Sequence, residues 1–401
     1  MSTDPPDPAS AGPLRGLRVV DLSTVLAGPY ATMILADLGA DVVKVEPPEG
    51  DATRGWGPPW VGSDAGGTRT AAYFLAVNRN KRSIVLDLRS ADDAEVLRRL
   101  LAGADVLVEN FRPGSLGRLG FDDAALAALN PRLVHLAISG YGPGGPLAER
   151  PGYDFVIQAS GGLMSITGAA DADGGEPTKV GVAISDVATG LYAVIGILAA
   201  LLARGDGAGP GQRVDTSLLG STLAVLVNQA QNAFTTGRAP GRRGNAHPNI
   251  VPYETFATAD GQLALAVGSE RQWPRCCAAI GLPELATDPR FATNGDRVTN
   301  RDVLRPIIAE RLATATSASW LAAFEAADVP AGPIRDVLAA FDAPEAVALG
   351  MSVEVEHPAL GVLRQVGIPL AFSATPGAIR TPPPLLGEHG PEILAELGLS
   401  S

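Results

Sequence analysis

The sequence predicts an α/β fold, with a parallel sheet covered by helices in the first half of the chain and a smaller α+β region after it. Short apolar segments of strand character alternate with amphipathic helical patterns up to about residue 204, and the loops between them are short. Strands that alternate with helices in this way pair in parallel through right-handed crossovers. The chain has 401 residues, enough for two domains, because a single core usually stops growing well before that length.

Strand and helix patterns follow one another in order along this first half. Segments rich in Val, Leu and Ile are predicted as buried strands: 17–23, 41–47, 83–89, 105–111 and 133–140. Segments with apolar residues at helical spacing are predicted as helices: 30–39, 91–104, 121–130 and 187–204.

The pattern changes in the second half of the chain. Residues 237–249 form a loop rich in Gly, Pro and Arg, and 254–268 are predicted as a hairpin that turns at Asp260-Gly261. Further helices are predicted at 271–281, 300–313 and 318–327, and the tail carries a hairpin pattern at 351–367 and a last helix in GPEILAELGL. We therefore divide the chain into a large domain, a small α+β domain and a tail: 1–225, 226–329 and 330–401.

Composition limits the classes of function. The formal net charge is −12, which is the wrong sign for a general binder of nucleic acid or of acidic membranes, so neither partner is expected. The longest apolar run, 191–203, is too short to span a bilayer and is predicted as a buried helix. Only three of the basic residues are lysines, which we attribute mainly to coding bias: Lys44, Lys81 and Lys179.

The cysteines and the start of the chain point to a cytoplasmic protein. Cys276 and Cys277 are adjacent, so they rarely pair with each other and match no zinc spacing. The first 16 residues are acidic and rich in Pro, without the basic and apolar regions of an export signal. We therefore expect a reducing compartment.

Most familiar cofactor and catalytic motifs are absent from the sequence. Gly140, Gly142 and Gly145 satisfy G-x-G-x-x-G after a strand, but the PLAERPG that follows cannot open a helix, so NAD is not expected. No P-loop and no G-x-S-x-G occurs. No metal site is expected, because the four histidines lack ligand spacing: His135, His247, His357 and His389.

Asp186 is the one candidate nucleophile. It immediately precedes a long apolar helical pattern, so its simplest interpretation is a helix N-cap that accepts backbone N–H groups. A second interpretation is compatible with the first. A carboxylate held at a helix N-terminus stays ionised, and an ionised carboxylate can attack a thioester.

Ordered stretches across the chain resemble the family III CoA-transferases over roughly residues 14–398. The main ones are LRGLRVVDLSTVLAGPYATMILADLGADVVKVE, GDATRGWGP, NRNKRSIVLDLRS, DVLVENFRPGSLGRLG, GYDFVIQASGGLMSITG, GVAISDVATGLYA, VPAGPI and PLLGEHGPEILAELG. GRRGNAHPNIVPYETF further looks like the branch that uses succinyl-CoA and small dicarboxylates such as glutarate.

The resemblance implies site residues, position by position. Asp186 falls on the catalytic aspartate of the family. The positions implied to contact CoA or acyl-CoA, which is a substrate here, are Leu26, Ala27, Leu86, Arg89, Asn110, Phe111, Arg112, Arg118 and Tyr153. All but Tyr153 lie at or after the carboxyl ends of predicted strands, where open parallel sheets bind ligands.

The resemblance also implies an architecture and a reaction. The family has a Rossmann-like large domain built from both chain ends, here 1–225 and 330–401, with the small α+β domain inserted, and it forms an interlocked homodimer. Asp186 would attack an acyl-CoA, giving first an acyl–aspartyl anhydride and then an aspartyl-CoA thioester that passes CoA to a carboxylic acid.

Two other functions remain open at this point. The related α-methylacyl-CoA racemases use a His in G-H-D as one of two acid/base groups, whereas this chain has Gly152-Tyr153-Asp154. An unperturbed tyrosine, with a pKa of about 10, is a poor partner at neutral pH. A catalytically inactive CoA-binding paralogue is the other alternative, but simple binding needs no nucleophile.

Overall fold

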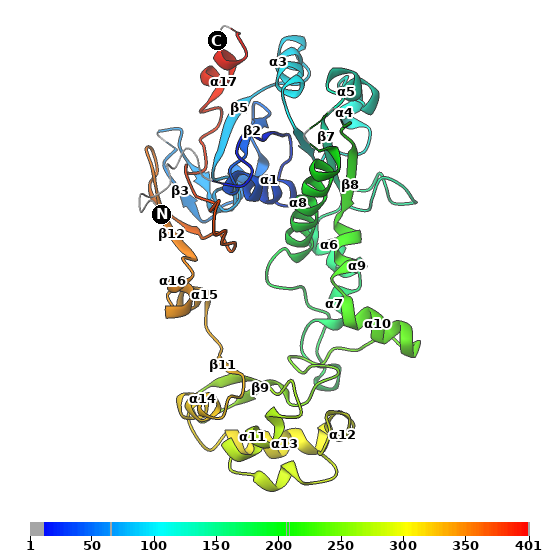
Figure 1. Cartoon of the computed structure of the whole chain (residues 1–401), viewed down its shortest axis with the longest axis vertical. Helices are drawn as coiled ribbons and strands as arrows, with labels where there is room; N and C mark the ends of the chain where they lie inside the picture. The colour runs from blue at the N-terminus through cyan, green and yellow to red at the C-terminus, as the bar shows by residue number, and fades with distance from the viewer. Residues whose placement is uncertain (1–11, 65, 206, 208, 400–401) are drawn as a thin grey trace. The chain divides into compact units, whose positions relative to one another are not determined.

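The structure is a computed structural model that describes residues 12–64, 66–205, 207 and 209–399 (Figure 1). Residues 1–11, which the sequence analysis assigns to the start of the large domain, lie outside the described residues. The chain divides into two compact units, each formed from separate segments. Unit 1 comprises Met1–Leu163, Val180–Gln231 and Pro344–Ser401, and unit 2 comprises Met164–Lys179 and Asn232–Ala343.

These bounds differ from the predicted domain limits at three places. Residues 164–179 and 330–343 lie in unit 2 although the sequence analysis assigns them to the large domain, and 226–231 lie in unit 1. The sequence carries no sign of the first difference, because residues 164–179 pack with a segment distant in the chain. Within unit 2, the backbone N–H of Asp171 donates to Arg242 O (3.2 Å).

A six-stranded parallel sheet forms the centre of unit 1, in the order β5-β2-β1-β6-β7-β8. Its strands are β1 (Arg18–Asp21), β2 (Asp41–Glu46), β5 (Lys81–Val85), β6 (Val106–Glu109), β7 (Val134–Ser139) and β8 (Arg213–Ser217). The five predicted strands are confirmed; β8 was not predicted, because RVDTS has a single large apolar residue. The strand order reverses between β1 and β6, and such a reversal opens a ligand-binding crevice at the carboxyl ends of the strands.

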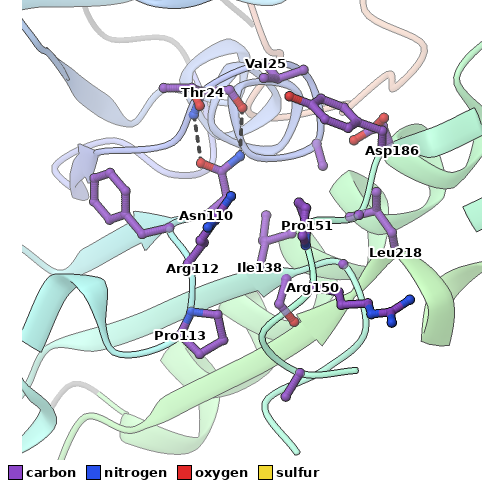
Figure 2. A pocket seen from close by; sticks show the side chains of 17 residues that line it. Thr24, Val25, Asn110, Arg112, Pro113, Ile138, Arg150, Pro151, Asp186 and Leu218 are labelled. Carbon is purple, nitrogen blue, oxygen red and sulfur yellow. Dashed lines mark hydrogen bonds between the residues drawn. The ribbon is translucent and has the colours of Figure 1, made fainter. Parts of the chain in front are cut away.

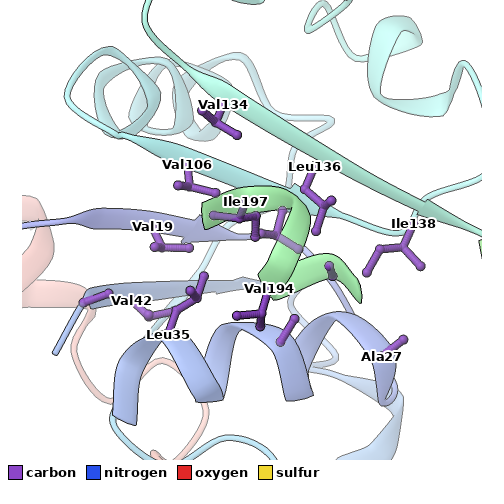
Figure 3. Packing of buried hydrophobic residues seen from close by; sticks show 14 of the residues in the cluster. Val19, Ala27, Leu35, Val42, Val106, Val134, Leu136, Ile138, Val194 and Ile197 are labelled. Atoms are coloured by element: carbon purple, nitrogen blue, oxygen red, sulfur yellow. The ribbon is translucent and has the colours of Figure 1, made fainter. Parts of the chain in front are cut away.

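Helices cover both faces of this sheet. Neighbouring residues of β1 point to opposite faces. Val19 joins the core cluster under α1 and α8, which Figure 3 shows, and Val20 joins the cluster under the other helices. The first face carries α1 (Ala27–Asp37) and α8 (Ile184–Arg204), and the second carries α3 (Ala91–Ala102), α5 (Asp123–Leu129) and α17 (Gly390–Glu396). A mixed α/β fold with a large parallel sheet is therefore confirmed.

Helix α8 is half-buried. By length and composition it is the one helix among the described residues that could cross a membrane, although a core helix of a soluble protein passes the same test. Its buried face, which includes Ala193 and Ile197, packs in the cluster on the sheet. Its other face exposes Leu191, Ile195 and Leu202, the last with 84% of its surface accessible. The predicted burial of this helix is thus right for one face and wrong for the other.

The remaining elements of unit 1 are short. They are η2 (Ala52–Gly55), β3 (Trp60–Val61), β4 (Thr70–Ala71), α2 (Ala72–Leu75), α4 (Ser115–Arg118), α6 (Asp154–Ser160), α9 (Leu218–Ala224), α16 (Pro344–Ala348), β12 (Ser352–His357) and β13 (Gly361–Val366). The predicted tail hairpin is confirmed as β12 and β13. Two helices span the boundaries between the units: α7 (Leu163–Ile166) and α10 (Val227–Thr236).

Unit 2 has a core of its own, formed by a three-stranded antiparallel sheet and helices. Its elements are η3 (Asp171–Asp173), β9 (Tyr253–Ala257), β10 (Gln262–Ala266), α11 (Gln272–Ala279), η4 (Pro283–Ala286), α12 (Asn294–Thr299), α13 (Arg301–Leu312), α14 (Ser317–Ala326), β11 (Ala331–Pro333) and α15 (Val337–Phe341). The predicted hairpin through Asp260-Gly261 and the three predicted helices are confirmed.

Candidate active site

The turn after β1 carries the chain into α1 and forms one wall of the candidate site. Val25 adopts a positive φ of 71°, which is uncommon for a β-branched residue, so the turn must be held by its surroundings. Asn110, which follows β6, supplies part of that hold. Its Oδ1 accepts from the Thr24 N–H (3.0 Å) and its Nδ2 donates to the Thr24 carbonyl (2.8 Å), as Figure 2 shows.

Asp186 is the third residue of α8. The N-cap is Ala183, so the predicted N-cap role of Asp186 is wrong. The reason lies in Asp154, at the start of α6, whose Oδ1 accepts from the Ser185 N–H (2.8 Å) and thereby satisfies an amide of the first turn. The other oxygen of Asp154 accepts from Gln158 Nε2 (2.7 Å). The side chain of Asp186 is therefore not needed to cap its own helix.

The pKa of Asp186 depends on influences that oppose one another. Burial, which leaves 9% of the residue accessible, and then the nearby charge of Asp154 raise the pKa of Asp186 to about 7. The backbone N–H of Ala27, which lines the same cavity, acts in the opposite direction and lowers this pKa. Burial and the charge of Asp154 thus oppose the expected effect of the helix terminus, which alone would keep this carboxylate ionised.

Two close backbone approaches shape the site. A Cβ atom at Gly190 would lie 2.9 Å from both Ala27 O and Tyr30 Cδ1, so glycine at this position lets α8 approach the first turn of α1. A Cβ atom at Gly140 would lie 2.7 Å from Gly152 Cα. Gly140, the first glycine of the G-x-G-x-x-G motif, therefore allows the backbone to pass close to Gly152 and does not begin a helix.

Six of the predicted site residues line one cavity. It has a volume of about 260 Å³, opens at the carboxyl ends of the strands, and contains Ala27, Asn110, Phe111, Arg112, Tyr153 and Asp186 (Figure 2). A second cavity of about 230 Å³ contains Leu86, Arg89 and, again, Phe111. Thr24 and Phe111 line both cavities, so the two are neighbours along the sheet edge.

Two predicted residues lie outside both cavities, and the polar groups of two others already have partners. Leu26 is the N-cap of α1 and Arg118 lies in α4, where it donates to Ser115 Oγ (2.7 Å); neither lines either cavity. Arg89 is exposed and pairs with Asp87 (2.8 Å). Asn110 lines the first cavity, but its amide group is occupied by the backbone of Thr24.

Several residues of the site were not predicted: Thr24, Val25, Asp154 and Arg150. Thr24 and Val25 carry no chemical signal in the sequence, because they contribute through backbone geometry. Asp154 had a weak signal, since an acid at the first position of a helix with Gln158 one turn later is typical of a helix start. Its proximity to Asp186 depends on the tertiary fold.

The model of the family described as CoA-transferase family III matches residues 14–390. The chain belongs to CoA-transferase family III. As a CoA-transferase it uses an acyl-CoA as substrate, which agrees with a cavity that contains a buried carboxylate and extends along the strand ends.

Relatives and a solved structure agree with this assignment over nearly the whole chain. A succinate–glutarate CoA-transferase of Agrobacterium fabrum is 46% identical over 386 residues, covering 96% of each chain. A succinyl-CoA:glutarate CoA-transferase of Mus musculus is 41% identical over 389 residues, covering 97% of this chain and 87% of the relative. The crystal structure of a CAIB/BAIF family protein from Brucella suis has a TM-score of 0.84 and 45% identity, covering 96% of this chain and all of that one.

The pKa of Asp186 makes the transferase sensitive to pH. If ionised Asp186 attacks the thioester, kcat/KM rises as the pH approaches about 7 and levels off above it, because kcat/KM reports the ionisation of the free enzyme. Asp154→Asn removes the neighbouring charge and should move this acid limb to lower pH by roughly one unit. Burial remains, so the limb should stay above the ordinary aspartate value.

Gln158→Met is the matched control. It removes the amide that donates to Asp154 but leaves the charge of Asp154 in place, so the acid limb should stay near pH 7. A kcat/KM that is flat from pH 5 to 9 in the wild-type enzyme would contradict the role of Asp186.

Proposed function

We propose that this transferase moves CoA from succinyl-CoA to a small dicarboxylic acid, with Asp186 as the covalent nucleophile. The observation that carries the proposal is a buried carboxylate in the wall of a cavity that adjoins a second cavity at the strand ends. The choice of acids is supported by two relatives, a succinate–glutarate CoA-transferase and a succinyl-CoA:glutarate CoA-transferase.

The proposed reaction needs no proton donor. A carboxylate oxygen of Asp186 attacks the thioester carbon of the donor, the C–S bond breaks, and CoA leaves as the thiolate. The thiolate then attacks the aspartyl carbonyl of the anhydride, forming an aspartyl-CoA thioester and releasing succinate. The acceptor carboxylate attacks this thioester, the C–S bond breaks, and a second anhydride and the CoA thiolate form. The thiolate then attacks the acceptor carbonyl of this anhydride, whose bond to the Asp186 oxygen breaks, which regenerates the Asp186 carboxylate and releases the new acyl-CoA.

The surroundings of Asp186 suit these steps. An anhydride is hydrolysed by water, and burial of the carboxylate limits the access of water. The first turn of α1 faces Asp186 with the N–H of Ala27. A backbone N–H at a helix N-terminus stabilises negative charge, first on the carboxylate and then on the oxyanion that forms from it.

The two neighbouring cavities suit a long ligand such as CoA. We place the thioester beside Asp186 and the nucleotide end beside Leu86 and Arg89, with Phe111 between them. The Arg89 side chain is 77% exposed and its ion pair with Asp87 is screened by water, so a phosphate group can compete for it.

A dicarboxylic acid also needs a cation for the carboxylate that does not react. Arg112 and Arg150 line the cavity with Asp186, and neither has an ion-pair partner among the described residues. Arg112 follows Phe111, which lines both cavities, and we assign Arg112 to CoA. Arg150 lies in the segment that leads to Tyr153, and we assign it to the far carboxylate of the acid.

We also propose that the transferase is a homodimer, as the family resemblance implies. The support is the number of large apolar side chains that unit 1 leaves exposed, since monomeric proteins rarely expose extended apolar surface. They include Phe155, Val182, Leu191, Tyr192, Ile195, Leu202 and Leu223.

Replacement of Asp186 tests the nucleophile. Asp186→Ala should lower the rate of CoA transfer at least 10⁴-fold, on the order of the loss seen when a covalent nucleophile is removed, while the Kd for CoA measured by calorimetry changes less than about threefold. Asp122→Ala, at the exposed N-cap of α5, is a control that should keep full activity. Substantial transfer by Asp186→Ala would contradict the assignment.

A panel of acceptor acids tests the substrate class. With succinyl-CoA as donor, C4 to C6 dicarboxylates should be converted to their CoA thioesters faster than oxalate or than monocarboxylates of the same chain length, as measured by mass spectrometry. Arg150→Gln should raise KM for glutarate about tenfold, because a charge-assisted hydrogen bond is lost. It should leave KM for valerate unchanged; equal effects on both acids would contradict the role of Arg150.

The oligomeric state is tested by light scattering. At micromolar concentration the protein should have the mass of two 41.1 kDa chains. A monomer under these conditions would contradict the proposed homodimer without affecting the assignment of Asp186.

A further inference from the structure

Two of the three lysines in the chain lie in the interior of unit 1, beneath the turn that faces Asp186. Lys44 and Lys81 have side chains with 0% of their surface accessible, and each forms an ion pair: Lys44 with Asp51 (3.0 Å) and Lys81 with Asp21 (3.1 Å). The reaction proposed above uses none of these four groups.

Lys44 and its partner Asp51 contact the backbone of the turn between β1 and α1. Its Nζ donates to the carbonyl of Ser23 (2.8 Å) and to Asp51 Oδ2 (3.0 Å). Asp51 Oδ1 accepts from the N–H and the hydroxyl of Thr53 (2.9 and 2.7 Å), and the N–H of Val25 lies 3.5 Å from it. The pair therefore contacts the backbone on both sides of Thr24, at the residue before and at the strained residue after it.

Lys81 ties the strand before the turn to the helix after it. Its Nζ donates to Asp21 Oδ2 (3.1 Å), to the carbonyl of Pro29 in the first turn of α1 (2.9 Å) and to Asn78 Oδ1 (2.9 Å). Asp21 Oδ1 in turn accepts from the N–H of Ser23 (2.9 Å). Both ends of the turn are thus attached to one ammonium group.

The chemistry of lysine explains its use here. An ammonium group directs three donors from one atom to three acceptors, which the planar guanidinium of arginine cannot do in the same space. Although burial disfavours its charge, Lys81 and Lys44 lower the pKa of Asp21 to about 2, so this acceptor stays ionised. Well-packed apolar residues usually stabilise a core at least as well as a buried ion pair does, so stability alone does not account for two such pairs.

We propose that Lys44 and Lys81 are positioning residues for CoA transfer: their ion pairs fix the turn of residues 23–27 so that the N–H of Ala27 faces Asp186. The inference rests on the proposed role of Asp186. Asn110, which lines the cavity, binds the backbone of Thr24, so it holds the turn together with the two lysine pairs. Gly190 allows the two helices to meet at the required distance.

The far end of α1 offers a matched control. Asp37, its last residue, forms a buried ion pair with Arg79 (2.7 Å) in which the two side chains are 4% and 3% accessible. This pair is also buried and also anchors α1, but it lies at the opposite end of the helix from Ala27. If buried ion pairs only stabilise the fold, loss of a pair at either end of α1 should have the same effects on Tm and kcat.

The test compares Lys44→Met and Lys81→Met with Arg79→Met in the full-length protein. All three should lower Tm. The two lysine variants should lower kcat for transfer from succinyl-CoA to glutarate by about 10- to 100-fold, as a displacement of about 1 Å does, while KM for succinyl-CoA stays within about threefold. Arg79→Met should keep kcat within threefold of wild type. Equal losses of kcat at both ends of α1, or none in the folded lysine variants, would overturn the inference.

The pH dependence of kcat/KM separates the two roles, because lysines that only stabilise the fold would not change the pKa of Asp186. Because the N–H of Ala27 lowers the pKa of Asp186, a displaced turn should shift the acid limb of kcat/KM above pH 7 in the lysine variants only. The other charged and titratable groups coupled to Asp186, which are Asp154 and Tyr73, are left unchanged in every variant. An unshifted limb in folded Lys44→Met would count against the inference.

Two further measurements test the inference if the Met variants do not fold or if the wild-type protein shows no transfer. If the Met variants do not fold, Asp51→Asn keeps the size of Asp51 and one acceptor oxygen for Thr53, but it removes the charge that pairs with Lys44. It should still lower kcat, and full activity in this folded variant would overturn the inference. If wild type transfers CoA to no acid tested, the proposed function fails separately. The pKa of Asp186 in ¹³C-aspartate-labelled protein, assigned with Asp186→Asn, should then rise in Lys44→Met and not in Arg79→Met, and equal values would overturn the inference.

Discussion

The contact between the first turns of α1 and α8 is the constraint on which the site depends. Asp186 in α8 is buried against the start of α1, where the N–H of Ala27 favours its charge while burial and Asp154 oppose it. The resulting pKa of about 7 lies above the unfolded value near 3.8. Protonation of Asp186 therefore stabilises the fold at low pH, and this contribution is lost as the pH rises through about 7. Burial of Asp186 in this contact thus costs stability at the pH where its carboxylate is ionised.

The sheet topology brings the parts of this contact together. The strand order reverses between β1 and β6, so the turn before α1 and the segment from Asn110 to Pro113 meet at one edge. The long connection from β7 to β8 contributes Tyr153, Asp154 and Asp186 to the same edge. Because both cavities lie along this edge and share Thr24 and Phe111, one extended ligand can fill them together.

Elements with a strong local pattern could be predicted from the sequence, and those set by distant contacts could not. The five apolar strands follow their sequence pattern, whereas β8, with its sequence RVDTS, has a weak one. The sequence indicates Asp186 as the candidate nucleophile, but its helix begins at Ile184, three residues before the predicted start. Asp154, 32 positions from Asp186, satisfies the Ser185 N–H in this first turn. The scarcity of lysine was attributed mainly to coding bias. No local pattern indicates that Lys81 pairs with Asp21, because the two residues lie 60 positions apart.

The most direct test of the account is to trap the covalent intermediate. The protein is mixed with succinyl-CoA, quenched within the first turnovers, digested and analysed by mass spectrometry. We expect the peptide that contains Asp186 to gain the mass of CoA minus that of one water molecule, and this adduct to disappear when glutarate is added before the quench. A transferase that turns over while no adduct forms on Asp186, or one that carries the adduct on another residue, would contradict it.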